Sequence, residues 1–247
     1  MRTEFEPFDL GAKTADDAGS AIETADFVAL PCGSFEQHSD HLPLLTDSIE
    51  ADHLAGEIAR RAEAFDIEIA VLPTLPYGYS EHHMNFPGTV TLDADTYQQV
   101  IEQIGASMAA HDADRLLIVN HHGGNREPLK LAADRLQRDH ELPTHVILPP
   151  FMEFARDRLN EHFGEGWGHA GDYETSVIEH YHPELVKSEA KEDQILKRSF
   201  ETRSPVYFDE MTEQGGLGDP TNADPAFIAE FIEEMVDGIL TRLEEDM

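Results

Sequence analysis

The stretch Arg115-Leu-Leu-Ile-Val-Asn-His-His-Gly-Gly-Asn125 shows the unit from which this chain is built. It opens with an apolar run, 115–119, that is short and rich in Ile, Val and Leu, as a buried strand is. A polar cluster follows at 120–125, and 126–140 then carries apolar residues at intervals of three and four, which is typical of a helix covering a sheet. A strand, a polar loop and a helix in this order predict an α/β unit.

The same order of elements recurs along the chain. Further apolar runs of the strand type lie at 26–31, 67–72 and 144–148. Further helices are expected at 48–65, at 94–111 with Asp93 or Asp95 as its cap, and from about Asp224 to the end. We therefore predict one α/β domain over 1–247, with a mostly parallel central sheet flanked by helices in a three-layer sandwich. Such sheets bind ligands at the carboxyl ends of their strands.

The chain is strongly acidic. Its 50 Asp and Glu residues against 17 Lys and Arg give a formal charge of −33. Self-repulsion on this scale weakens a compact fold in dilute buffer, whereas molar salt shortens the Debye length to roughly 3 Å. The acids are spread along the whole chain instead of forming a tail, so we expect a halophilic protein rather than an acidic partner-binding one. Because no basic stripe is present, nucleic acid is not an expected partner.

The first residues are acidic, and no run approaches the roughly 18 apolar residues that span a bilayer. We therefore expect a cytoplasmic protein without a membrane partner. The single cysteine, Cys32, excludes an internal disulfide and is expected to be a small buried hydrophobe.

Carboxylates and imidazoles follow the expected strands, which favours a metal centre. Glu36 and His38 are one residue apart, so in an extended loop each can reach a different metal, and Asp47 can bridge the two. One ion is expected at Glu36, Asp47 and His122. The second is expected at His38, Asp47 and Glu174. Oxygen and nitrogen ligands without thiolate suit Zn²⁺, Mn²⁺ or Fe²⁺, and two such ions about 3.5 to 4 Å apart activate water for amide hydrolysis.

Two further histidines, His169 and His83, have no expected metal. One of them would carry a proton to the leaving nitrogen, and we prefer His169, although spacing alone does not decide between them. Among 14 histidines any single one is more often a surface or core residue than a ligand. Only the joint arrangement of the expected ligands sets them apart.

The chain also resembles a known family, the creatininase or creatinine amidohydrolase superfamily of two-metal C–N hydrolases. The likeness spans roughly residues 28 to 245 and keeps the order of the family's motifs. The matching motifs lie at 31–38, 41–47, 80–92, 119–125, 168–176 and 216–220.

The resemblance implies a mostly parallel α/β fold, a dinuclear site and a homo-oligomer, commonly a hexamer built as a trimer of dimers. It supports the ligand roles above and catalytic roles for His169 and Glu174. In creatininase proper a glutamate ligand stands two places after the histidine that matches His122, where this chain has Gly124, so Glu174 is the matching candidate for the missing acid. The expected substrate-binding set is Ser80, His83, Gly123, Gly124, Asn125 and Trp167.

The Gly-Gly-Asn form of 123–125 resembles a branch containing archaeal formamide hydrolases, which deformylate a formylaminopyrimidine ribonucleotide on the way to riboflavin and the deazaflavin cofactor. We prefer that small molecule as substrate, with Arg126, Lys130 or the helix start after Asn125 meeting its phosphate. Creatinine is an alternative, although creatininase closes its pocket with several tryptophans and this chain has only Trp167. Two others are a small modified peptide trimmed during redox-cofactor maturation and a catalytically silent binding or scaffold protein, which Gly124 favours.

Overall fold

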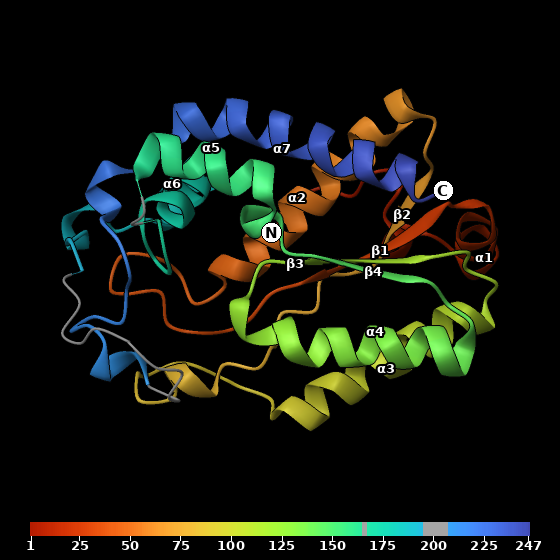
Figure 1. The fold of residues 1–247 in the computed structure, drawn as a ribbon, viewed down its shortest axis with the longest axis horizontal. Coiled ribbons are helices and arrows are strands. Elements are labelled where there is room, and N and C mark those ends of the chain that lie inside the picture. The colour runs from red at the N-terminus through yellow and green to blue at the C-terminus, as the bar shows by residue number, and fades with distance from the viewer. Residues whose placement is uncertain (165–166, 195–206) are drawn as a thin grey trace.

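The fold is built around a four-stranded, all-parallel sheet with the strand order β2-β1-β3-β4 (Figure 1). The computed structural model describes residues 1–164, 167–194 and 207–247. The strands are β1 (Phe27–Cys32), β2 (Ile69–Val71), β3 (Leu116–Asn120) and β4 (Thr144–Ile147). β1 and β3 pair from Val28 and Leu116 to Cys32 and Asn120, so these central strands end side by side.

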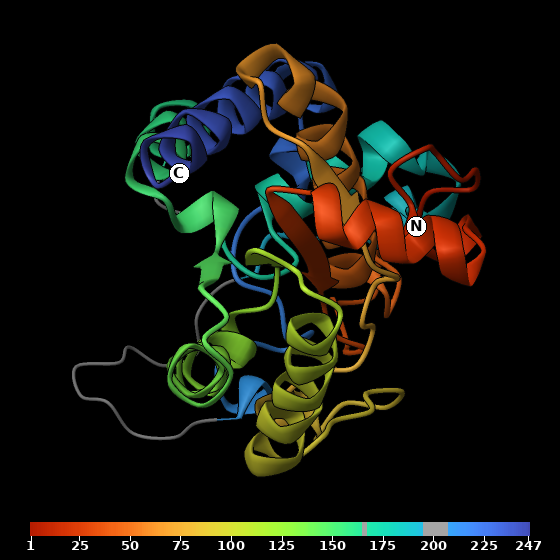
Figure 2. The same cartoon turned by 90° about the vertical axis from the view of Figure 1, so that its right-hand side faces the viewer.

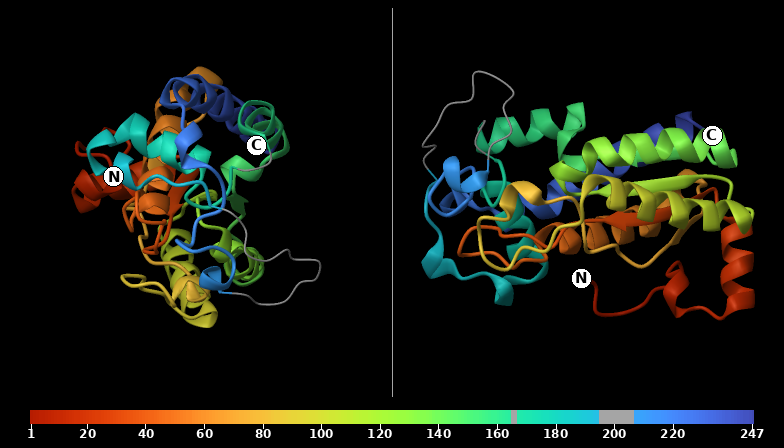
Figure 3. Two further views of the ribbon diagram at one scale, coloured as in Figure 1. Left: turned by 90° about the vertical axis from the view of Figure 1, so that its left-hand side faces the viewer. Right: turned by 90° about the horizontal axis from the view of Figure 1, so that it is seen from below.

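Helices cover both faces of this sheet. The α-helices of the described residues are α1 (Ala15–Thr24), α2 (Thr46–Ala62), α3 (Ala94–Ala110), α4 (Arg126–His140), α5 (Glu153–Phe163), α6 (Asp172–Tyr181) and α7 (Pro225–Glu245). In Figure 1, α3 and α4 lie below the sheet, while α2, α5, α6 and α7 lie above it. Figure 2 shows the same three layers from one side. The right panel of Figure 3 shows the loops gathered at the end of the molecule away from the C-terminus.

The central strands are buried on both faces, which explains their continuous apolar sequence. Successive side chains of a strand point to opposite faces. Phe27 and Leu117 accordingly pack in one core with α2, α5, α6 and α7. Val28 and Leu116 pack in a second core with α1, α3 and α4. Cys32 is fully buried in this second core, and burial raises the pKa of its thiol to about 12, as suits a small core residue.

The α/β fold with a parallel sheet flanked by helices is confirmed, with small shifts at the element ends. The expected helix 126–140 is α4, and Asp93 caps α3 by accepting a hydrogen bond from the backbone N–H of Thr96. The helix expected at 48–65 begins earlier, at Thr46, and its last residues form a separate 3-10 turn, Glu63–Phe65. Asp47 therefore lies in the first turn of α2 and not in the loop before it.

Within the described ranges, no helix has both the length and the apolar character needed to cross a bilayer.

Candidate metal centre

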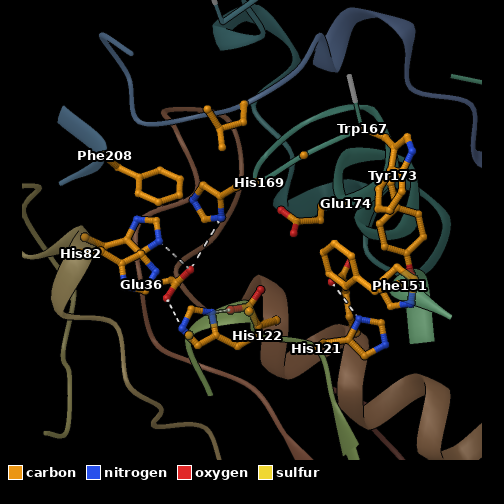
Figure 4. Close-up of a pocket in the computed structure, with 18 residues that line it drawn as sticks. Glu36, His82, His121, His122, Phe151, Trp167, His169, Tyr173, Glu174 and Phe208 are labelled. Atoms are coloured by element: carbon orange, nitrogen blue, oxygen red, sulfur yellow. Dashed lines mark hydrogen bonds and ion pairs between the residues drawn. The ribbon is translucent and has the colours of Figure 1, made fainter. Parts of the chain in front are cut away.

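A cavity of about 410 Å³ lies at the carboxyl end of the sheet (Figure 4). The loops after β1 and β3, the first turns of α2 and the start of α6 all contribute to it. Its described lining holds four carboxylates, five histidines and four other aromatic side chains, but no lysine or arginine. This composition favours a cation over an anion.

Asp47 lies at the centre of the buried charges. Its Oδ1 is 3.1 Å from Nε2 of His38, and its Oδ2 is 3.1 Å from Nδ1 of His122. Ser34 donates a hydrogen bond from Oγ to Asp47 Oδ2 at 2.8 Å and so restrains the carboxylate. Each Asp47 oxygen therefore faces a different imidazole, as in a carboxylate that bridges two cations.

Backbone carbonyls set the orientation of both imidazoles. His38 Nδ1 lies 3.1 Å from the backbone oxygen of Glu36, and His122 Nε2 lies 2.9 Å from the backbone oxygen of Tyr79. A carbonyl accepts only, so the proton of each neutral ring sits on that nitrogen. In the neutral rings the nitrogens available to a cation are then Nε2 of His38 and Nδ1 of His122, and both point at Asp47. A histidine held in this way by its second nitrogen is typical of metal ligands.

Glu36 has its side chain buried among histidines without a hydrogen bond. Its two oxygens find no hydrogen-bond partner in the described part of the chain. Yet His83 Nε2 lies 3.2 Å from Oε1, His122 Nε2 3.2 Å from Oε2, and His169 Nδ1 3.7 Å from Oε1. A buried carboxylate is costly unless neighbouring groups or a cation balance its charge. This donor set of oxygen and imidazole nitrogen fits a divalent cation such as Zn²⁺, Mn²⁺ or Fe²⁺.

The pKa values of His38 and Asp47 are shifted by the charges that are gathered in this cluster. Burial alone would lower the pKa of His38, but the adjacent Asp47 carboxylate raises it to about 10, so without a cation Nε2 holds a proton at pH 7 that a bound cation would replace. Burial would raise the pKa of Asp47, but His38 and His122 lower it well below its usual value. Asp47 is thus held as a carboxylate, the form that binds metal.

Glu174 lies near His38 and Asp47. It sits in the first turn of α6, and its Oε2 accepts a hydrogen bond from the backbone N–H of Ala170 at 2.6 Å and lies 3.6 Å from His38 Nε2. Burial raises the pKa of Glu174 despite the nearby His38. The five residues expected from the sequence to be ligands are therefore brought into one buried cluster.

Gln37 distinguishes His169 from His83. Its Oε1 accepts from the backbone N–H of Ser39, so its amide nitrogen is the donor that contacts His83 Nδ1 at 2.8 Å. The His83 proton must then sit on Nε2, which faces Glu36. His169 Nε2 lies 3.2 Å from the same amide nitrogen but only 2.8 Å from the backbone oxygen of Gln37, to which it donates, so its Nδ1 is left bare. Burial and the nearby His38 lower the pKa of His169 to about 3, so this ring is neutral at pH 7.

Two members of the expected substrate-binding set do not line the cavity. Ser80 is fully buried, with Oγ 3.3 Å from His122 Nε2. Asn125 accepts a hydrogen bond from the backbone N–H of Tyr79 and donates to the backbone oxygen of Gly33, so it ties the loops after three strands together. Direct contact of these two side chains with substrate is therefore not supported. The other four members, His83, Gly123, Gly124 and Trp167, do line the cavity.

Gly124 is required by close packing. A Cβ atom there would lie 2.2 Å from the backbone oxygen of Tyr79 and 2.5 Å from His122 Nε2. No side chain fits at this position while the two loops keep their places. The packing of the two loops thus excludes an acidic side chain at position 124.

Arg126 and Lys130, expected to meet a phosphate, lie outside the cavity lining. Arg126 Nε is 3.9 Å and Lys130 Nζ 3.4 Å from the exposed Glu127 carboxylate. The interpretation of these two residues as phosphate contacts is therefore not supported.

The structure adds cavity residues that the sequence reasoning missed. Glu50 lies one turn after Asp47 on α2, and its Oε2 is 3.2 Å from Nδ1 of His121. Burial, then the Asp47 charge, raises the pKa of Glu50, and burial lowers the pKa of His121 to about 4. His82 stacks on His122 with ring centroids 5.6 Å apart. The i to i+3 spacing from Asp47 was the available signal for Glu50.

The comparisons with known proteins agree with this geometry. The family model described as "Creatininase: Creatinine amidohydrolase" matches residues 12–243. The "Mycofactocin precursor peptide peptidase" of Mycobacterium tuberculosis is 30% identical over 257 residues, covering 95% of this chain and 90% of that protein. The "Creatinine amidohydrolase" of Pseudomonas putida is 30% identical over 194 residues, covering 72% and 73%.

Solved creatininase structures have the same fold. The one described as "Creatininase Mn" and a variant described as "Zn-Zn type" each superpose with a TM-score of 0.84 at 24% identity, covering 98% of this chain and 99% of theirs. The fold and the buried cluster define an α/β protein with a candidate metal centre at the carboxyl end of its sheet. The chain belongs to the creatininase family.

Proposed function

We propose that this protein is a metal-dependent amidohydrolase that cleaves a C–N bond of a small molecule. The observation that carries the proposal is the Asp47 carboxylate, whose two oxygens lie 3.1 Å from His38 Nε2 and His122 Nδ1, the nitrogens available to a cation. The buried oxygens of Glu36, which lie 3.2 Å from His83 and His122, supply a further anionic ligand. Family membership supports the reaction class, because two relatives bear the names of an amidohydrolase and a peptidase.

These contacts support an assignment of two cation positions. Glu36, Asp47 and His122 would hold one ion, and His38, Asp47 and Glu174 the second. Two divalent ions held there would supply Lewis acidity, lowering the pKa of a water and polarising the amide carbonyl. Solved relatives described with Mn and with Zn support these metals as candidates.

His169 is our candidate for the proton carrier. Its Nδ1 is bare and faces the cavity near Glu36, while its other nitrogen is anchored on the Gln37 backbone. A neutral imidazole in this position can accept a proton from the attacking water and deliver it to the leaving nitrogen. His83 has no free nitrogen of this kind, because Gln37 occupies its Nδ1.

The cavity favours a flat, uncharged or cationic amide. Phe151, Trp167 and Tyr173 form one side of it. The ring centroids of Phe151 and Trp167 are 5.6 Å apart, and those of Trp167 and Tyr173 are 6.3 Å apart. The described lining offers no basic side chain for a phosphate. The formylaminopyrimidine ribonucleotide is one candidate substrate, because it carries an aromatic ring and a formamide. The free formylaminopyrimidine, creatinine and a short peptide are the competing candidates.

A metal-reconstituted screen tests the proposal. The chelator-treated protein is supplied with Mn²⁺, Zn²⁺ or Fe²⁺, and hydrolysis of these four compounds is followed side by side. We expect turnover of at least one amide that disappears with chelator and returns with metal. His169→Gln serves as the catalytic control and should bind the same metals while losing most turnover.

The silent-protein alternative has a different outcome. A chain that binds no divalent ion, or binds ions yet hydrolyses none of the amides while a known creatininase does so in the same assay, would favour a binding or scaffold role.

The charge of −33 supports a further proposal, that the protein works in concentrated salt. Screening of self-repulsion should raise the unfolding temperature steeply between dilute and molar KCl. A flat response would contradict salt adaptation and leave the active-site proposal intact. The native mass, measured in the same salt, tests the expected hexamer.

A further inference from the structure

Glu50 is a buried carboxylate that the proposed mechanism does not use. It is only 2% exposed, and it lines the main cavity one helical turn after Asp47. Its Oε2 lies 3.2 Å from His121 Nδ1. Its Oε1 has no hydrogen-bond partner in the described part of the chain. One oxygen is therefore held and the other is available to a ligand.

Glu50 belongs to a cluster of three carboxylates. One oxygen each from Asp47, Glu50 and Glu174 lie within 4.8 Å of one another. Three carboxylates so close in a buried place can be ionised together only when a cation lies between them. Oxygen ligands of one divalent ion, each about 2.0 to 2.2 Å from the metal, fall in this range of mutual distances.

The surroundings of Glu50 restrict the side from which a cation can reach it. Behind Glu50 and His121 lies a second cavity of about 10 Å³, lined largely by apolar side chains such as Leu54, Val177 and Ile232. A void of this size and lining does not hold an ion. The main cavity is the open side, and it is there that Asp47 and Glu174 lie.

The charge balance also includes Glu50. Glu36, Asp47 and Glu174 carry three negative charges when ionised, and Glu50 adds a fourth. Four carboxylates match the charge of two divalent ions.

We propose that Glu50 is a further ligand of the divalent cation held by Asp47 and Glu174, and that His121 positions it. The His121 Nδ1–H would hold Oε2, so that Oε1 is directed at the ion, as hydrogen bonds commonly orient carboxylate ligands. This inference rests on the proposed function, because it concerns one of the two cation positions described there.

Ion binding tests the inference without relying on turnover. Chelator-treated full-length protein is titrated with Mn²⁺, and bound ions are counted after gel filtration. The wild type should bind two ions per chain. Glu50→Gln keeps the shape but loses the anionic oxygen, so it should retain one tight ion while the affinity for the other falls about tenfold or more. The Co²⁺ form of this variant should show a changed visible absorption spectrum.

Two further variants keep the test decisive. His121→Asn can still donate an N–H and should weaken the same ion less than Glu50→Gln does. Glu50→Asp provides an anionic alternative with a shorter reach if Glu50→Gln does not fold, and it should also weaken one ion only. Asp52→Asn, a buried carboxylate on the same helix that contacts Arg2 and not the cavity, is the matched control and should bind both ions normally.

The outcomes separate this inference from the function on which it rests. If the wild type binds two ions and folded Glu50→Gln binds both with unchanged affinity and an unchanged Co²⁺ spectrum, Glu50 is not a ligand. A variant that only raises KM for a substrate, with normal ion binding, would likewise overturn the inference and make Glu50 a substrate contact. A wild type that binds no ion would refute the proposed function itself.

Discussion

The two sides of the cavity are built differently (Figure 4). One side, the histidine wall, consists of Glu36, His82, His83, His122 and His169. The other, the aromatic wall, consists of Phe151, Trp167 and Tyr173. In the histidine wall, hydrogen bonds to the backbone or to Gln37 orient three of the imidazoles. In the aromatic wall, the rings contact one another edge to face or tilted, and Phe151 is 58% exposed.

The difference has a consequence for function. Hydrogen bonds fix both the position and the protonated nitrogen of a ring, which proton transfer and metal binding require. Ring contacts restrict position alone and tolerate a change of side chain. We therefore expect the histidine wall to determine the reaction and the aromatic wall to determine which amide is accepted. The predictions below test this division.

The largest effect is expected for Asp47→Asn. The amide has only one oxygen and no charge, so it cannot supply an anionic oxygen beside both His38 and His122 as the carboxylate does. We expect loss of bound metal, measured by elemental analysis, and turnover at background level. Asp52→Asn, on the same helix but away from the cavity, should keep its metal. Full activity of metal-free Asp47→Asn would remove the basis of the proposed function.

Substitution of His169 should come next. His169→Gln removes the bare Nδ1 while leaving the metal cluster in place, so kcat should fall by about 10² to 10⁴. His83→Gln is the matched comparison, and its effect should be smaller because His83 has no free nitrogen for proton transfer. Steady-state kinetics with metal content measured in parallel will check this. A larger loss in His83→Gln would reverse the assignment of the two residues.

A smaller effect is expected for Ser34→Ala. This change deletes the 2.8 Å hydrogen bond to Asp47 Oδ2, and such second-sphere contacts typically contribute about 10- to 100-fold to metal affinity. Competition with a chelator measures the loss. Ser48→Ala is the control, because its hydroxyl contacts the Ser34 backbone and not Asp47. Equal affinities in the two variants would show that Ser34 does not orient the carboxylate.

The smallest effect is expected in the aromatic wall. Phe151→Ala should raise KM roughly three- to tenfold with little change in kcat, since a half-exposed ring loses only about 1 kcal/mol of apolar contact. Leu131→Ala, which removes a similarly exposed apolar side chain on α4, should change neither constant. A large fall in kcat for Phe151→Ala would break the division between the two walls.

Much of the fold was predictable because its strands bury both faces and its helices bury one. The predicted helix 126–140 matches α4, and the strand 115–119 is displaced by one residue. Periodicity alone did not locate the start of α2, because its first residues, Thr46 and Asp47, are buried although they are polar, and a pattern of apolar residues does not mark them. β2 is only Ile69–Val71, shorter than its apolar run, because few of its residues find partners on β1.

The candidate site divides in the same way. Glu36 and His38 were predictable as a pair because both lie in the loop after β1. His122 was predictable because it lies just after β3, the strand that pairs with β1. Glu50 and His121 were not singled out, because in a chain with 50 acids and 14 histidines no single residue is distinctive. Asn125 was assigned to substrate, whereas its hydrogen bonds lie between loops that are far apart in the sequence.

By itself, the sequence determined the parallel sheet, the edge at which polar residues gather and the chemical types of the ligands, because these follow from local hydrophobic periodicity and from residues adjacent to strand ends. Only the tertiary structure decided which nitrogen of each imidazole is free, why no side chain fits at Gly124, and that Glu50 faces Glu174. These features depend on distances of 3 to 5 Å between distant segments. Packing sets such distances, and sequence spacing does not encode them.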